Sequence, residues 1–229
     1  MKNDYNLDHI IDSFYTKGST KFLNRKEYLQ AKNKIPKRIQ KLYQPYENAN
    51  KVIIYKKDLP DIGICKITFN SPVRHPMILK ELFNLGLKEE MFGDIIVEDN
   101  IAYIYIFNDL YTDIKYNFTL NKISIKSIEL LDIDYLSDYQ IQYDELELLV
   151  SSLRIDNIIS SITNDSRKSI VERFKNKDII LNYDIVSKNS ILLEPDDIFS
   201  IRHFGKYKFN SIIKNTKKGG YIISVSKYK

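Results

Sequence analysis

The sequence has little cysteine and little glycine. Cys65 is the one cysteine among 229 residues, which excludes an intramolecular disulfide and argues against a thiolate metal cage. With 7 glycines in total, the chain shows no phosphate-binding or dinucleotide-binding loop and no cofactor loop of the kind a methyltransferase needs. No apolar run reaches the roughly 18 residues of a membrane span. The first residues, Met1 to Asp4, lack a signal-peptide layout. We therefore expect a cytoplasmic protein with no membrane partner, no cofactor and no metal.

What the sequence does contain is a full complement of core-forming and charged residues. Apolar residues make up 43% and charged residues 28% of the chain, which is ordinary for a globular protein. This length is enough for one to three domains.

Charge is segregated along the chain. Residues 1–57 hold 13 Lys/Arg against 5 Asp/Glu, residues 58–150 hold 7 against 17, and residues 151–229 hold 15 against 8. Basic ends favour a polyanion through phosphate contacts and counterion release. An acidic middle packed against basic flanks inside one protein would give the same distribution, so charge alone leaves both interpretations open.

Hydrophobic spacing predicts an α+β protein of three domains. Residues 1–71 form a basic α/β domain, with helices near 7–15 and 25–34 and strands at 52–55 and 63–69. Residues 72–147 form an acidic α+β domain, with a hairpin over 93–107 and an acidic connector over 132–147. Residues 148–229 begin with two helices, near 153–162 and 166–174, and continue as short strands between 179 and 225.

The third domain carries a series of short motifs in a fixed order. They are Leu153-Arg154-Ile155-Asp156, Ser166-Arg167-Lys168, Ile179-Ile180-Leu181-Asn182 and Asp197-Ile198. In order and spacing this run resembles the S4 RNA-binding domain, also called αL-type. The resemblance implies an S4 domain over 148–229.

The wider chain resembles the YlmH family of bacterial S4-domain proteins. The motifs are Ser151 to Asp156, Arg202-His203-Phe204-Gly205-Lys206-Tyr207, Thr216 to Gly219, Leu85-Gly86 and Gly93 to Val97. The chain departs from the family pattern at Pro76, Met77, Lys80 and Lys177. Lys177 replaces a glycine, so we expect a different helix-to-strand turn there, because glycine takes positive φ freely and lysine does not.

The family resemblance implies fold, partners and function. The middle domain would be RRM-like. The protein would be a non-catalytic RNA-binding protein that acts on ribosomal RNA of the large subunit and on peptidyl-tRNA, without a small-molecule substrate. It would serve in rescue or quality control of stalled translation. The family is also linked to cell division.

The basic residues of the third domain are the candidate RNA contacts. Arg167 and Lys168 lie in the first turn of the second helix, where the dipole disfavours cations unless a phosphate binds there too; an ordinary solvent-facing pair is the alternative. Arg154 makes either an RNA contact or an internal salt bridge, and being two residues from Asp156 it shares no helix face with it. Lys206 and Lys208 alternate with Tyr207 and Phe209, which predicts a basic outer face over an aromatic core, with stacking of these rings on bases as the alternative. The complete predicted set is Arg154, Ser166, Arg167, Lys168, Arg173, Lys175, Lys177, Asn182, Arg202, Lys206, Lys208, Lys217 and Lys218.

Two other classes of function compete. Pseudouridine synthases carry their catalytic aspartate in an Arg-Leu-Asp motif, but Leu153 to Asp156 lacks the flanking glycines and already serves as the S4 entry. An RNA-modifying enzyme would therefore need a site within the first 150 residues. A protein-interaction adaptor would use the acidic middle, and a large exposed apolar patch there would favour it.

Overall fold

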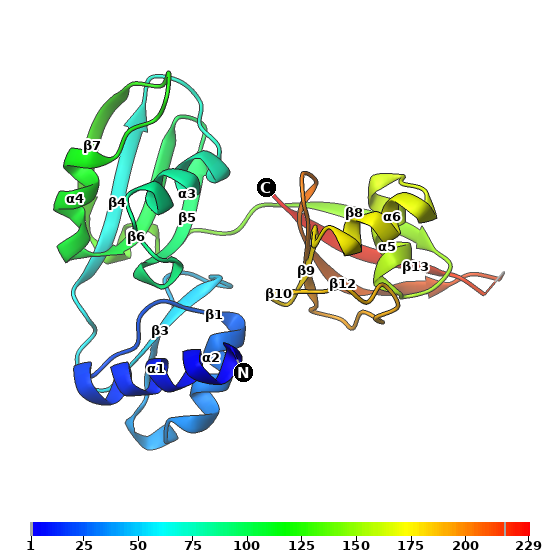
Figure 1. Ribbon diagram of the computed structural model, residues 1–229, viewed down its shortest axis with the longest axis horizontal. Helices are drawn as coiled ribbons and strands as arrows, with labels where there is room; N and C mark the ends of the chain where they lie inside the picture. The colour runs from blue at the N-terminus through cyan, green and yellow to red at the C-terminus, as the bar shows by residue number, and fades with distance from the viewer. Residues whose placement is uncertain (1, 218) are drawn as a thin grey trace. The chain divides into compact units, whose positions relative to one another are not determined.

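The computed structural model describes residues 2–217 and 219–229 and divides the chain into two compact units, residues 1–140 (unit 1) and 141–229 (unit 2). The predicted RNA contact Lys218 lies outside the described residues. Helices and three β-sheets are found in the described part (Figure 1). The predicted α+β class is therefore confirmed. The finer division into three domains stays a prediction.

The beginning of unit 1 packs two helices on a small sheet. Its elements are α1 (Lys2–Lys17), β1 (Leu23–Asn24), α2 (Arg25–Lys34), the 3-10 turn η1 (Lys37–Ile39), β2 (Lys41–Tyr43) and β3 (Lys51–Tyr55), with strand order β1-β3-β2. Helix α2 starts at a capping box in which Asn24 accepts from the Glu27 amide at 3.0 Å and Glu27 accepts from the Asn24 amide. Phe14, Ala31 and Ile54 are buried between these elements.

The rest of unit 1 is a four-stranded antiparallel sheet with two helices. It consists of β4 (Ile62–Phe69), α3 (His75–Asn84), η2 (Glu89–Met91), β5 (Phe92–Glu98), β6 (Ile101–Phe107), η3 (Asn108–Leu110), α4 (Tyr111–Asn117), β7 (Ile125–Leu131) and η4 (Ile133–Leu136). The strand order is β5-β6-β4-β7. This β-α-β-β-α-β succession is that of the ferredoxin-like motif. Strand β4, which precedes the expected boundary at residue 72, pairs with both β6 and β7.

One face of this sheet forms the core with the helices. Ile78 and Leu82 of α3 and Ile114 of α4 share a buried cluster with Cys65 and Ile104 of the strands. Helix α3 ends at Asn84, and Gly86 follows the cap residue Leu85 with φ 80°, the left-handed conformation that commonly ends a helix.

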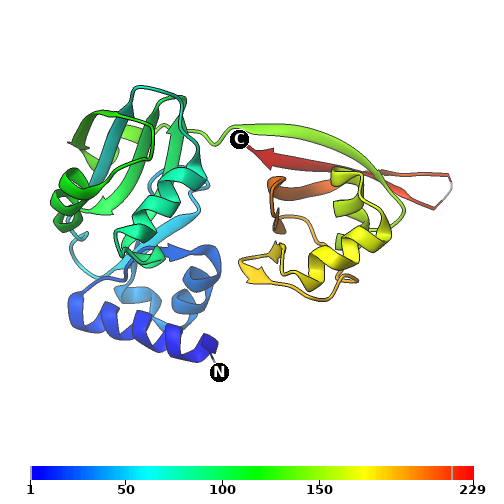
Figure 2. The same cartoon turned by 45° about the horizontal axis from the view of Figure 1, so that its top comes forward.

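Unit 2 wraps a six-stranded sheet around two short helices (Figure 2). Its elements are β8 (Tyr143–Val150), α5 (Ile155–Thr163), α6 (Arg167–Lys175), β9 (Ile179–Leu181), β10 (Asp184–Ile185), β11 (Ile198–Ile201), β12 (Gly205–Asn215) and β13 (Tyr221–Tyr228). The strand order is β10-β9-β11-β12-β13-β8. Residues 143–147, predicted as part of a connector, are the first half of β8. The acidic side chains of this segment are compatible with a strand because β8 lies at the edge of the sheet and has one solvent-exposed face.

The core of unit 2 comes from one stripe of each helix. Ile155, Ile158 and Ile159 of α5 are 0% exposed, and Ile170 and Phe174 of α6 are 2% exposed. At i, i+3 and i+4 these residues occupy one face of each helix, and for α5 this is the spacing that predicted the helix.

The turn after α6 corrects one expectation. Lys177 adopts φ 60°, so the left-handed turn that glycine would favour is kept, not altered. The Lys177 amide donates to the carbonyl of Phe174 at 3.2 Å, and the Asp178 amide donates to that of Arg173 at 3.0 Å. This pair of bonds is a Schellman cap, whose satisfied carbonyls offset the strain of a lysine at positive φ.

Candidate nucleic-acid interface

The start of α6 presents two exposed cations, Arg167 and Lys168. Ser166 caps the helix, its Oγ accepting from the Ser169 amide at 3.2 Å. Arg167 and Lys168 follow in the first turn and are exposed, and neither forms an ion pair with any residue the structure describes. Amide N–H groups and the helix dipole at this end favour an anion. The helix start therefore has the charge and the donors that bind a phosphate.

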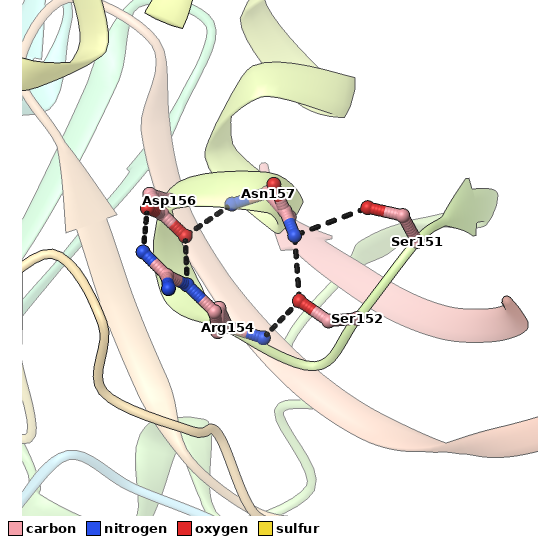
Figure 3. Close-up of polar contacts among 5 residues, drawn as sticks. All are labelled: Ser151, Ser152, Arg154, Asp156 and Asn157. Atoms are coloured by element: carbon pink, nitrogen blue, oxygen red, sulfur yellow. Dashed lines mark hydrogen bonds and ion pairs between the residues drawn. The ribbon is translucent and has the colours of Figure 1, made fainter.

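Arg154 lies at the start of α5, where its side chain is held by Asp156 (Figure 3). The guanidinium donates from Nε to Oδ1 at 3.0 Å and from Nη2 to Oδ2 at 2.6 Å. This internal salt bridge was one of the two predicted alternatives. The argument that the two residues share no helix face did not forbid it, because Arg154 is the N-cap residue of α5 and precedes the helix. Its side chain keeps 42% exposure, so part of the guanidinium still faces solvent.

Four other predicted cations are already paired. Arg173 binds Asp165 at 2.6 Å and places its guanidinium 4.8 Å from the centre of the Phe204 ring. The remaining pairs are Lys175 with Glu172 at 3.0 Å, Arg202 with Asp178 at 3.3 Å and Lys208 with Asp196 at 2.7 Å. A paired cation contributes less to the field that a phosphate meets, so these positions are weaker candidates than Arg167 and Lys168.

Strand β12 has the predicted two-sided character. Tyr207 and Phe209 are 2% and 0% exposed, whereas Lys206 and Lys208 lie on the half-buried outer side. Lys206 Nζ is 4.6 Å from the centre of the Tyr228 ring. The expected aromatic core is thus present, with Lys206 and Lys208 on the side away from it and Lys208 paired with Asp196.

Of the remaining predicted RNA contacts, two are exposed lysines and one is an asparagine that stabilises the fold. Lys177 and Lys217 are exposed and make no ion pair within the described ranges. Asn182 donates to Asp197 at 2.7 Å and accepts from the Ile198 amide at 3.0 Å. Both of these bonds of Asn182 tie strand β9 to the start of β11, so its side chain serves the fold.

The structure brings two predicted residues together with several that the sequence did not single out. Arg154 and Arg167 line one groove, which Asn157, Ser160 and Asn189 also line. Asn189 reaches α5 because its carbonyl accepts from the Asp156 amide at 3.4 Å. No local motif signals this approach, since 33 residues separate Asn189 from Asp156 in the sequence.

The second face of the unit 1 sheet is covered by aromatic side chains of unit 1. Tyr105 of β6 is 0% exposed, and its ring centre lies 6.2 Å from that of Tyr46. Tyr103 lies 6.0 Å from Tyr135 in the same way. Since these β6 rings are covered, they offer no open platform for stacking on bases.

Asp94 is hydrogen-bonded to Tyr46, one of the rings that cover this face of the sheet. Its carboxylate accepts from the hydroxyl of Tyr46 and from the Asn50 amide at 2.8 Å. Burial, with the neighbouring Asp94 charge, raises the pKa of Tyr46 well above its ordinary range. A Cβ on Gly93 would lie 2.7 Å from the Tyr105 Cβ, so a larger residue at this position would displace the Tyr105 ring.

The remaining reactive side chains are dispersed. Burial raises the pKa of the Cys65 thiol to about 12, so it is protonated at neutral pH. Within the described ranges no cluster of His, Cys, Asp or Glu is arranged to hold a metal ion. In the part of the chain that the structure describes, no helix has the length and apolarity of a membrane span.

These features define a class, an α+β protein with a small basic unit whose second helix begins with two exposed cations. Comparisons with known proteins place it more closely. Residues 61–137 match the family described as "Putative RNA-binding domain in YlmH". The chain is 27% identical over 157 residues to ribosome-associated protein quality control protein P2 of Bacillus subtilis (strain 168), across 69% of this chain and 61% of the relative. These matches confirm the resemblance to the YlmH family that the motifs implied.

A solved structure was also matched. It is the cell division protein ylmH from Streptococcus pneumoniae, with a TM-score of 0.45 and 18% identity over 55% of this chain and 87% of that one. The chain spans 61% of the length of the curated relative, so the activity of that whole protein is treated below as a proposal.

Proposed function

We propose that this chain is a non-catalytic RNA-binding protein that acts on the ribosome, contacting large-subunit RNA and peptidyl-tRNA during rescue or quality control of stalled translation. The observation that carries the proposal is the start of α6, where Arg167 and Lys168 are exposed and without carboxylate partners among the described residues. RNA binding is supported by the family match over residues 61–137, and the ribosomal setting by the name of the Bacillus relative.

The domain identities within the proposal rest on topology and on motifs. Two short helices followed by a small sheet, with the predicted motif residues at the helix starts, support an S4 domain in unit 2. The β-α-β-β-α-β order of β4 to β7 supports an RRM-like domain in unit 1. The covered Tyr103 and Tyr105 distinguish it from a domain that stacks bases on an open sheet.

Binding itself is the activity in this proposal. The free cations of unit 2 contact phosphates, which position the protein without reading sequence. A helix start and a set of dispersed lysines suit the shape and backbone of a folded RNA more than a base code. Preference for RNA over DNA follows from the family match alone.

The RNA-modifying alternative has less support from the described residues. In the motif that resembles a synthase, both carboxylate oxygens of Asp156 accept from Arg154, and Oδ1 also accepts from the Asn157 amide. A carboxylate engaged in this way is a poor nucleophile or base. Cys65 is buried and protonated.

The decisive experiment is co-sedimentation with separated ribosomal subunits at two salt concentrations. Wild type is expected to travel with the large subunit and to be released as salt rises, because phosphate contacts dominate. The double variant Arg167→Glu/Lys168→Glu is expected to remain at the top of the gradient.

A matched control separates the site from net charge. Lys56→Glu/Lys57→Glu makes the same change in charge at two exposed lysines of unit 1, and it should co-sediment as wild type does. If wild type stays at the top at low salt, the ribosomal proposal fails. If both double variants dissociate alike, the binding is non-specific and the assignment to α6 is wrong.

A further inference from the structure

Beside the start of α6 lies a groove of about 370 Å³. Its lining comes from both helices of unit 2 and from the segment before β11, and comprises Arg154, Asp156, Asn157, Ser160, Arg167, Ile170, Val171 and Asn189. This volume is at the lower end of the range of small-ligand pockets. It suits one nucleotide and is too small for a stretch of RNA strand.

The groove combines a charged rim with amide groups. Arg167 is unpaired within the described residues and stands at the start of α6. The Asn189 side chain makes no hydrogen bond with any residue that the structure describes. An asparagine amide has both donors and an acceptor, which can pair with the edge of a base. The lining therefore offers a cation for a phosphate and polar groups for a base.

Arg154 is fixed in the wall of this groove. The fork with Asp156 uses Nε and one Nη2 hydrogen, so Nη1 remains available to a ligand (Figure 3). Asn157 is held in turn by the hydroxyls of Ser151 and Ser152, to which its amide nitrogen donates. A site whose polar side chains are already ordered binds without the cost of ordering them.

Part of the lining is apolar and comes from α6. Val171 is 39% exposed although it is a hydrophobic residue, and its neighbour Ile170, which also lines the groove, is 2% exposed. A flat base can lie against such a wall or against the plane of a guanidinium, as unstacked bases do in protein–RNA complexes.

We propose that this groove takes a single unpaired nucleotide extruded from the folded RNA that unit 2 binds. Its phosphate lies at Arg167, and its base lies between Val171 and Arg154 with Asn189 at the base edge. The inference rests on the proposed function, because the neighbouring phosphate contacts bring the RNA to the groove. It adds a preference that phosphate contacts alone do not give, namely for a helix with a bulged nucleotide over a continuous one.

The test uses the full chain and fluorescently labelled RNA hairpins at one fixed salt concentration. One hairpin has a continuous stem, and four others carry a single bulged A, C, G or U at the same position. Wild type is expected to bind at least one bulged hairpin about tenfold more tightly than the continuous one, the effect of one well-held base.

Two variants change the groove without changing charge. Val171→Phe fills it, and Asn189→Ala removes the unpartnered amide. Both are expected to lower affinity for the preferred bulged hairpin toward that of the continuous one, with affinity for the continuous one unchanged. Ile180→Phe is the matched control, because Ile180 is also a β-branched residue at 39% exposure but lies on β9 outside the groove. Amide spectra of each variant establish that unit 2 is folded.

The outcomes separate the inference from the proposed function. If wild type binds all five hairpins equally and binding depends on Arg167 and Lys168, the proposed function stands and the groove inference is overturned. If Val171→Phe and Ile180→Phe weaken bulged and continuous hairpins alike, it is also overturned. If wild type binds neither hairpins nor ribosomal subunits, both fail.

Discussion

At the scale of single residues, Lys177 is one of the non-glycine residues that this chain holds in the left-handed conformation. A residue with a Cβ in the left-handed region costs about 1–2 kcal/mol, and Lys177 has φ 60°. Glycine avoids this cost but loses about 0.5–1 kcal/mol more backbone entropy on folding. We expect Lys177→Gly to raise the free energy of unfolding of unit 2 by about 0.5–1 kcal/mol.

Denaturation followed residue by residue in amide spectra measures this for unit 2 alone. The control is Lys177→Ala, which removes the same charge but keeps the Cβ and should change stability by less than about 0.5 kcal/mol, as an ordinary surface substitution does. Equal stabilisation by both variants would show that charge, and not backbone strain, is the cause.

Individual residues also show where sequence reasoning stops. That Arg167 and Lys168 follow a helix cap could be predicted, because Ser166 and its helix are local in sequence. That Arg202 and Lys208 are neutralised could not, because Asp178 is 24 residues from Arg202 and Asp196 is 12 from Lys208. Long-range pairs depend on how strands are brought together, which a list of basic residues does not reveal.

At the scale of elements, short-range sequence patterns predicted most of the helices and strands. The bounds of α2 were predicted at 25–34 as found, and a capping box of Asn24 and Glu27 marks its start. Strand β6 was likewise identified from its β-branched and aromatic run at 101–107. The first half of β8 was missed because an exposed edge strand alternates acids with partly buried residues, and its acids resembled a connector. The groove was missed because it forms only when the segment containing Asn189 folds back onto α5.

Helix α6 is tied to the loop that precedes it by the Asp165–Arg173 pair, and this tie should be sensitive to acid. The hydrogen bond from Arg173 lowers the pKa of Asp165 below its ordinary value. A carboxylate with a depressed folded-state pKa adds stability above its unfolded-state pKa and loses that contribution as pH falls through the folded-state value. We therefore expect Asp165→Asn to destabilise unit 2 at neutral pH and to have a shrinking effect as pH falls below about 4.

A double-mutant cycle isolates the pair. Unfolding of unit 2 would be followed from neutral pH to pH 3 in wild type, Asp165→Asn, Arg173→Gln and the double variant. In the Arg173→Gln background, Asp165→Asn should have little effect on the pH dependence, because the hydrogen bond is already gone. An unchanged acid response in the single Asp165→Asn variant would contradict the assignment.

At the scale of the whole molecule, the balance of paired and unpaired cations decides how binding responds to salt. Each phosphate contact contributes about 0.7–0.9 to the slope of log K against log salt concentration. Arg167→Gln/Lys168→Gln should therefore reduce that slope by about 2 for a ribosomal RNA fragment.

The control variant Arg202→Gln/Lys208→Gln removes the same charge, but both side chains already have carboxylate partners. Fewer RNA counterions are released by such cations, so this control should reduce the slope by less than about 1. Equal reductions, measured by anisotropy titrations at several salt concentrations, would mean that the net charge of unit 2 and not the start of α6 governs the attraction to RNA.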